Sequence, residues 1–285
     1  MINSIISVDL EDWDTSAYLR NYLSKNNNCP KIVDSTYPIL DLFARKKVKA
    51  TFFVLGIIAE KYPDLIKEIF NHGHEIASHG YSHNPLWGLN KEKFRKEIKK
   101  TNAIIENIIK NKPRGFRAPY ASLDKKTFWA IDVLKEEGFR YDSSIFPMLT
   151  PLYGAPAAPV APYKISSENI YTNDPESGLL EVPFTVFNFG LFKIPCTGGF
   201  YGRVIPLFLL KYLFKRVSRD RYVNFYFHPW ETLPSIPRVK APLFNKFVSY
   251  FNVDNYLDKI EQLLDCLKGV SFKDYSELEA GKVFG

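Results

Sequence analysis

Two histidines that could bind one metal ion, His79 and His83, lie four residues apart in the segment Ser-His-Gly-Tyr-Ser-His. On one helical turn both imidazoles would face the same side, as two ligands of a single ion must. The spacing is a loose pattern, and a chance pair of surface histidines is an equally good interpretation. No glutamate follows His79, so this is not the H-E-x-x-H sequence of metalloproteases. The pair predicts a metal site only if a carboxylate joins it.

Carboxylates are concentrated near the N-terminus, where Asp9, Glu11 and Asp12 follow an apolar run. Three carboxylates within four residues repel one another unless a cation or protons intervene. An acidic turn that caps a helix is the alternative interpretation. Because α/β proteins place their active sites at the carboxyl ends of parallel strands, we expect this cluster to form part of such a site.

Three further polar residues end later apolar runs. Arg117 could pair with a surface acid, or it could hold a catalytic carboxylate ionised. Asp142 lies in a Tyr-Asp-Ser-Ser segment, for which a turn is the simpler interpretation. His228 ends an apolar strand pattern and precedes a proline, so it is either a core histidine with one hydrogen bond or a general acid that titrates near neutrality.

The elements that must position these residues alternate between apolar runs and helical patterns from residue 5 to about residue 145. Residues 5–10, 48–55 and 75–78 predict buried strands, and Asn90 is placed to cap a helix over residues 91–110. The alternation indicates βαβ crossovers and a parallel sheet or barrel. Each candidate group follows a predicted strand, so we expect all of them on one rim.

The rest of the chain predicts a single domain over residues 1–285 rather than two. Residues 147–178 are rich in proline, and we favour an ordered loop over the active face because strand patterns resume directly after it. A helical extension is expected from about residue 232. The length of 285 residues and the hydrophobic share of 46% allow a sizeable core.

Composition excludes several classes of protein. The charged fraction of 24% argues against disorder, and the three cysteines form no C-x-x-C pair. The net charge is +7, but the basic residues do not have the spacing of a nucleic-acid-binding motif. No run approaches the roughly 20 apolar residues of a membrane span, and no signal peptide is evident. We therefore expect a cytoplasmic protein. The apolar segment 204–214 is more typical of a core helix, with peripheral membrane contact as the alternative, and nothing indicates an oligomeric state.

Five motifs in order resemble those of the polysaccharide deacetylases with a NodB homology domain, carbohydrate esterase family 4. Asp-Leu-Glu-Asp-Trp at 9–13 is similar to the family's Thr-Phe-Asp-Asp. The others are Ala-Thr-Phe-Phe-Val at 50–54 with Gly56, the histidine segment at 78–83, Arg-Ala-Pro-Tyr at 117–120 and Phe-His at 227–228. The Asp-x-Glu-Asp-Trp start, Gly-Gly-Phe-Tyr-Gly-Arg at 198–203 and His-Pro-Trp-Glu at 228–231 resemble a bacterial branch associated with exopolysaccharide biosynthesis.

The resemblance implies a distorted (β/α) barrel with about seven parallel strands. It also implies a metal-dependent enzyme that hydrolyses a linear amide and removes an N-acetyl group from an amino sugar of a polysaccharide, a surface glycan or its precursor. The expected partner is therefore a carbohydrate and not a nucleic acid. A deformylase or cyclic-amide hydrolase on the same fold, or a non-catalytic glycan-binding module, are the alternatives.

The resemblance also implies roles for residues. The metal would be Zn²⁺ first, with Co²⁺, Ni²⁺ or Fe²⁺ as alternatives, held by Asp12, His79 and His83. Because the family's adjacent Asp-Asp is spread here, Glu11 could replace Asp12 as the ligand. Asp9 would be the base that Arg117 orients, and His228 the acid, with Asp142 as a candidate to tune it. The substrate-binding candidates are Trp13, Pro119, Tyr120, Asp142 and Trp230.

Overall fold

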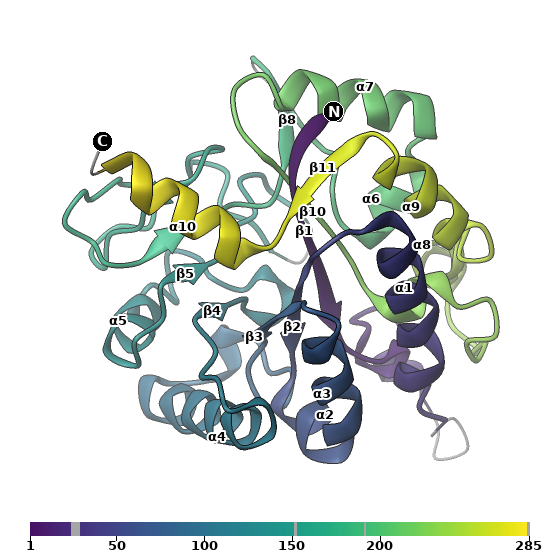
Figure 1. Ribbon diagram of the computed structural model, residues 1–285, viewed down its shortest axis with the longest axis horizontal. Helices are drawn as coiled ribbons and strands as arrows, with labels where there is room; N and C mark the ends of the chain where they lie inside the picture. Colours follow the sequence, from purple (N-terminus) through teal and green to yellow (C-terminus); the bar gives the residue numbers. More distant parts are fainter. Residues whose placement is uncertain (24–28, 151–152, 191, 284–285) are drawn as a thin grey trace.

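A curled, mostly parallel sheet forms the frame of the molecule in the computed structural model, which describes residues 1–23, 29–150, 153–190 and 192–283 (Figure 1). Its strand order is β10-β1-β2-β3-β4-β5-β7-β6, with β11 also paired to β1. The pair β6–β7 is antiparallel, and β8 and β9 form a separate antiparallel hairpin. The strands are β1 Ile2–Leu10, β2 Thr51–Val54, β3 Glu75–Ser78, β4 Gly115–Phe116, β5 Tyr141–Asp142, β6 Tyr163–Lys164, β7 Leu180–Glu181, β8 Val186–Phe189, β9 Phe192–Pro195, β10 Val223–Phe227 and β11 Leu267–Val270.

Most helices pack on one face of this sheet (Figure 1), whereas Phe272 and Tyr275 of the last helix pack with Ile5 and Phe53 on its other face. Local signals account for several of them: the Asn90 side chain accepts a hydrogen bond from the Lys93 N–H at the start of α4, and Pro63 stands in the first turn of α3. The helices are α1 Ile32–Lys46, α2 Gly56–Lys61, α3 Pro63–Asn71, α4 Lys91–Ile109, α5 Trp129–Glu136, α6 Gly199–Val204, α7 Leu207–Val217, α8 Leu243–Tyr250, α9 Tyr256–Leu264 and α10 Phe272–Val283.

The largest apolar cluster lies between the sheet and its helices. It joins residues of β1, β2 and β10 to residues of α1, α3, α7 and α9. Strand β1 is buried along almost its whole length, and β10 and β11 both pair with it. The first and last parts of the chain therefore share one sheet.

The expected α/β fold with a curled parallel sheet is confirmed. Within residues 147–178, of which 151–152 lie outside the described residues, the structure contains β6 and an isolated bridge between Ile165 and Asn173. The region after residue 232 includes β11 as well as helices, so it is not purely helical. No helix in the described part of the chain has the length and apolar character needed to cross a membrane.

The register of the strands explains why residues remote in sequence meet at one end of the sheet. Val8 of β1 lies beside Phe227 of β10, so the residues that follow, Asp9 and His228, are neighbours. Ser78 of β3 lies beside Phe116 of β4, so His79 and Arg117 are likewise adjacent. Parallel pairing thus delivers the side chains after each strand to one rim.

Candidate active site

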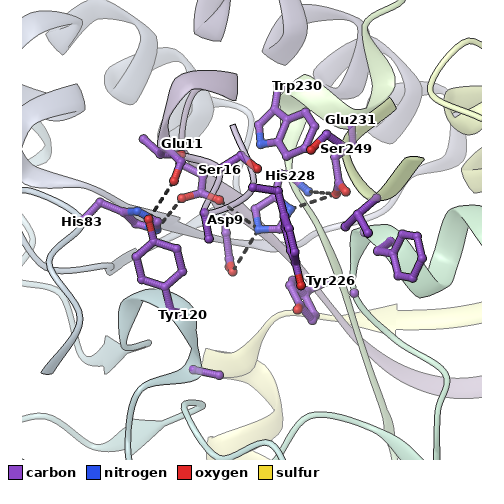
Figure 2. Close-up of a pocket in the computed structure, with 18 of the residues that line it drawn as sticks. Asp9, Glu11, Ser16, His83, Tyr120, Tyr226, His228, Trp230, Glu231 and Ser249 are labelled. Carbon is purple, nitrogen blue, oxygen red and sulfur yellow. Dashed lines mark hydrogen bonds and ion pairs between the residues drawn. The ribbon is translucent and has the colours of Figure 1, made fainter. Parts of the chain in front are cut away.

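A pocket opens at this rim, at the carboxyl ends of β1, β3, β4 and β10. Polar residues from the first half of the chain form one part of its wall. Another part comes from the second half of the chain, from residues 198–201, 203, 228, 230–231 and 248–249. Figure 2 shows how the labelled side chains converge on the space between these parts.

The pocket contains a group of side chains that suits a divalent metal ion: Glu11, His79 and His83 each offer one ligand atom, and these atoms lie within 4.8 Å of one another. Nε2 of His83 is 2.5 Å from Oε2 of Glu11. Nδ1 of His79 lies 2.7 Å from the carbonyl oxygen of Arg117, an acceptor, so Nδ1 carries the hydrogen and Nε2 keeps its lone pair. A backbone carbonyl that orients a histidine in this way is a frequent feature of metal sites.

The protonation states of this group also suit a metal. Burial lowers the pKa of His79 to about 4, so the ring is neutral at pH 7. Burial alone would raise the pKa of Glu11, but the facing His83 and His228 rings outweigh it and hold that pKa well below its usual value. A neutral imidazole and an ionised carboxylate are the forms that bind metals.

The two histidines lie in a loop after β3, so the expected helical turn is wrong. Gly80 has a φ of +76° and His83 a φ of +58°, and such left-handed residues do not continue a right-handed helix. The rings still converge, with centroids 5.4 Å apart. The loop therefore points both imidazole rings to the same side, as we expected a helical turn to do.

Asp12 lies outside this group, which corrects its assignment as the carboxylate ligand. Its Oδ1 accepts a hydrogen bond from the Trp13 N–H at 2.8 Å. Its Oδ2 accepts from the N–H groups of Lys31 and Ile32 at 2.7 and 3.1 Å, which ties this turn to the start of α1. Glu11 lines the pocket together with Asp9, whereas Asp12 does not.

Asp9 is held by a buried arginine at the inner side of the pocket. Nη1 of Arg117 is 2.5 Å from Oδ1 of Asp9 and also donates to Ser7. Nε and Nη2 of Arg117 donate to the backbone carbonyl and the hydroxyl of Ser143. The guanidinium is fully buried, so it presents a fixed positive charge that keeps Asp9 oriented.

His228 faces Asp9 and Glu11 across the pocket (Figure 2). Its Nε2 lies 4.0 Å from Oδ2 of Asp9 and 3.0 Å from Oε1 of Glu11. Its Nδ1 lies 2.8 Å from Oε2 of Glu231, whose other oxygen accepts hydrogen bonds from Arg203 at 3.0 and 3.2 Å. Burial would lower the pKa of His228, but the Glu11 and Glu231 carboxylates outweigh it and raise that pKa well above its usual value.

Glu231 and Arg203 were not identified from the sequence as parts of the site. The Glu231 side chain also accepts from the His228 N–H at 3.0 Å, a reciprocal cap that the His-Pro-Trp-Glu spacing could have indicated. A Cβ on Gly199 would meet the Glu231 carboxylate at 1.6 Å, so only glycine fits beside this acid. Arg203 comes from α6 and had no local signal.

Asp142 does not tune His228 and does not line the pocket. It is fully buried at the end of β5, where it accepts a hydrogen bond from the Ser144 hydroxyl and lies next to Glu181 of β7. Burial raises the pKa of Asp142 to about 6. Burial and the neighbouring Asp142 also raise the pKa of Glu181 well above its usual value, which indicates a shared proton. The pair supports the Ser143–Ser144 turn against which Arg117 rests.

The expected substrate-binding residues separate into two groups. Trp13 is 1% exposed, packs in an apolar cluster and donates its indole N–H to the Cys29 carbonyl, so it cannot stack on a sugar. Pro119 does not line the pocket, whereas Tyr120 and Trp230 do. Trp230 stacks on His228 with centroids 5.9 Å apart. Tyr120 has a φ of +57°, a strained backbone for a non-glycine residue and a feature of many functional sites.

Comparison of the chain with protein families divides it into two matched segments. Residues 27–141 match the model described as polysaccharide deacetylase. Residues 143–279 match a model described as a domain of unknown function (DUF3473). Glu11, His79, His83 and Arg117 thus lie before or within the first segment, whereas Arg203, His228 and Glu231 lie within the second.

Curated relatives match the chain over about a third of its length. A peptidoglycan-N-acetylglucosamine deacetylase of Bacillus cereus is 40% identical over 101 residues, covering 35% of this chain and 37% of that protein. A chitin deacetylase of Arthroderma benhamiae is 44% identical over 92 residues, covering 30% of this chain and 24% of that protein. A chitooligosaccharide deacetylase of Rhizobium leguminosarum bv. trifolii is 37% identical over 92 residues, covering 32% of this chain and 40% of that protein. The match therefore spans less than half the length of each of these relatives.

Solved structures extend the likeness of the fold over nearly the whole chain. A Pseudomonas aeruginosa PAO1 protein described as a probable polysaccharide deacetylase superimposes with a TM-score of 0.61 and 14% identity, covering 96% of this chain and 89% of that one. PuuE allantoinase gives a TM-score of 0.61 and 15% identity, covering 96% and 88%. At these identities the likeness shows the fold alone. Residues 27–141 therefore match a polysaccharide deacetylase model, within a fold that is similar to solved structures of such proteins over nearly the whole chain.

Proposed function

We propose that the chain is a metal-dependent hydrolase that removes an N-acetyl group from an amino sugar of a polysaccharide, a surface glycan or a glycan precursor. The observation that carries the proposal is the convergence of Glu11, His79 and His83 beside the Asp9–Arg117 pair, with His228 facing them. Deacetylase relatives that act on chitooligosaccharide and peptidoglycan support the substrate class.

The donor set fits Zn²⁺, with Co²⁺, Ni²⁺ and Fe²⁺ as alternatives, because two imidazoles and one carboxylate leave a coordination position open. Glu11, His79 and His83 would hold the ion. When bound, it polarises the acyl carbonyl and lowers the pKa of a water molecule towards about 7.

Asp9 then acts as the general base. It accepts a proton from the attacking water as the new C–O bond forms, and the Arg117 guanidinium keeps it oriented for this step. The backbone N–H of Tyr120, a residue that lines the pocket, would stabilise the negative charge that develops on the acyl oxygen.

His228 acts as the general acid. It donates its Nε2 proton to the sugar nitrogen as the C–N bond breaks, which releases the amine and the carboxylate product. Glu231 accepts from Nδ1, which fixes the ring orientation and stabilises the imidazolium, and Arg203 holds Glu231 in turn. Tyr120 would contact the sugar from the pocket wall, and the largely buried Trp230 supports the His228 ring on which it stacks.

The two alternatives are a cyclic-amide hydrolase and a non-catalytic glycan-binding module. The likeness to PuuE allantoinase favours a cyclic amide as the substrate, whereas the curated relatives reported above are deacetylases. A Bacillus anthracis protein of similar fold is a CE4 family pseudoenzyme, so the fold does not guarantee activity. Here a base, an acid and three candidate ligands all meet in one pocket, which favours an active enzyme.

Release of acetate from N-acetylated glucosamine oligosaccharides and from peptidoglycan tests the proposal. We expect release in the presence of Zn²⁺, its loss after chelation and its return when Zn²⁺ is added back. The His79→Ala, His83→Ala double variant should bind no metal and release no acetate. Full activity in that variant, or no activity of the metal-loaded protein on any N-acetylated glycan while allantoin is hydrolysed, would contradict the proposal.

A Glu231→Gln variant should lower kcat by about 10- to 100-fold, part of the contribution of a general acid, and change KM by much less. The amide cannot stabilise a protonated His228 as a carboxylate does. It does not contact the candidate metal ligands, so the metal should remain bound. Steady-state kinetics on an oligosaccharide that the parent deacetylates, with metal content measured in parallel, check this. Glu231→Asp, which keeps the charge, should recover part of kcat. An unchanged kcat, or a loss explained by lost metal, would contradict the role given to Glu231.

A further inference from the structure

The segment from residue 182 to residue 219 has an unusual charge pattern. Its 38 residues contain no Asp or Glu, but six Lys or Arg and nine Phe or Tyr. Asp220 is the first acid after it. The net charge of +7 for the whole chain is thus accompanied by a region that is locally both basic and aromatic.

The hairpin β8–β9 within this segment exposes large apolar side chains. Phe189 and Phe192 are 70% and 71% exposed, and Ile194 is 42% exposed. The two strands pair with each other and not with the main sheet. Because the side chains of Phe189 and Phe192 are mostly exposed, they bury little apolar area in the folded chain.

Helix α7 lies beside this hairpin and adds to the exposed apolar surface (Figure 1). Phe208, Leu209 and Tyr212 are exposed in its first half, while the opposite face packs into the main core. In its last turn, Lys215 and Arg216 are exposed on the same side of the helix as Phe208 and Tyr212. The helix therefore presents an apolar end followed by a basic end.

We propose that the face formed by β8–β9 and the exposed side of α7, called here the docking face, binds an anionic membrane surface. The apolar side chains Phe189, Phe192 and Phe208 enter the interface between headgroups and acyl chains, and Lys215 and Arg216 contact the phosphates. A basic amphipathic surface of exposed aromatic and aliphatic side chains has the chemistry that such an interface recognises.

Charge favours the membrane over a second copy of the chain. A two-fold dimer through this face would place two acid-free, basic surfaces against each other, which repel. Anionic headgroups neutralise the same cations while the acyl region accepts the apolar side chains. An anionic membrane therefore complements both the positive charge and the exposed apolar side chains of the docking face.

The docking face is joined directly to the pocket. Residues 198–203, which form part of the pocket wall, connect β9 to α7. Docking would thus hold this wall close to the lipid surface, which suits a glycan that is assembled at, or attached to, a membrane. The inference itself rests on the surface and does not depend on the proposed chemistry.

Co-sedimentation of the full chain with vesicles tests the inference. We expect binding to vesicles that contain phosphatidylglycerol. Binding to pure phosphatidylcholine vesicles should be weaker by about tenfold or more. The Phe189→Ser, Phe192→Ser variant and the Lys215→Glu, Arg216→Glu variant should each reduce binding to the anionic vesicles by about tenfold or more, and added salt should weaken binding of the parent.

Matched controls lie on other elements. Leu278→Ser on α10 removes an exposed apolar side chain, and Lys93→Glu, Lys96→Glu on α4 makes the same charge change as the basic variant. Both should bind like the parent, and all variants should keep the parent's thermal unfolding temperature to show that they are folded. Absence of binding to anionic vesicles, or equal binding of the docking-face and control variants, would overturn the inference. A dimer in solution that Phe189→Ser, Phe192→Ser dissociates would instead show that a second copy covers this face.

Discussion

A Glu11→Gln variant should lose the metal ion and lower activity by more than about 100-fold, because even substitution of an outer partner of a metal ligand costs about 10- to 100-fold. Glu11 supplies the only carboxylate of the candidate group, and an amide oxygen is a far weaker ligand for Zn²⁺. The measurement is metal stoichiometry by mass spectrometry after dialysis, together with acetate release at saturating Zn²⁺.

Asp12→Asn is the matched control, since it makes the same chemical change one residue along the chain. Both oxygens of Asp12 accept backbone hydrogen bonds, and an amide keeps only one acceptor oxygen. We therefore expect the metal to remain and the free energy of unfolding to fall by about 1 kcal/mol, the net contribution of one hydrogen bond. Urea unfolding measures this loss. If Asp12→Asn lost the metal and Glu11→Gln kept it, Asp12 would be the ligand after all.

An Asp9→Asn variant should keep the metal and lose about 100- to 10,000-fold in kcat, the usual contribution of a general base. The amide cannot accept the proton of the attacking water, whereas the candidate ligands Glu11, His79 and His83 are untouched. Arg117 would lose its carboxylate partner and remain buried, so the stability of the variant must be measured alongside.

Steady-state kinetics and metal content on the same Asp9→Asn preparation check the prediction at a temperature where both proteins are folded. An Arg117→Lys variant offers a graded comparison, because it keeps the charge beside Asp9 but loses the donors to Ser143. We expect it to fall between the parent and Asp9→Asn. Activity of Asp9→Asn within about twofold of the parent would remove Asp9 as the base.

The common rim could be predicted from the sequence because it follows from chain topology. Apolar runs that end in polar residues, separated by helical patterns, require parallel strands, and parallel strands bring their carboxyl ends together. Asp9, Arg117 and His228 line one pocket for this reason, and their roles stay predictions. The choice between Glu11 and Asp12 could not be predicted in this way, because both residues lie in the turn after β1.

Other features depend on contacts that no local pattern encodes. Arg203 meets Glu231 across 28 residues of chain, and both are needed to explain how His228 is held. Trp13 is buried because segments remote in sequence, including Trp230, close over it. The conformation of the His79–His83 loop is decided by the left-handed Gly80 and His83 backbones, whose φ angles a spacing of four does not reveal.

A crystal structure of the protein grown with Zn²⁺, with anomalous diffraction recorded at the zinc edge, tests the central claim most directly. We predict one strong anomalous peak in the pocket, about 2.0–2.2 Å from a carboxylate oxygen of Glu11 and from one nitrogen each of His79 and His83, with Asp9 beside it. A peak bound by Asp12, or no peak in the pocket while zinc occupies another part of the chain, would contradict the account.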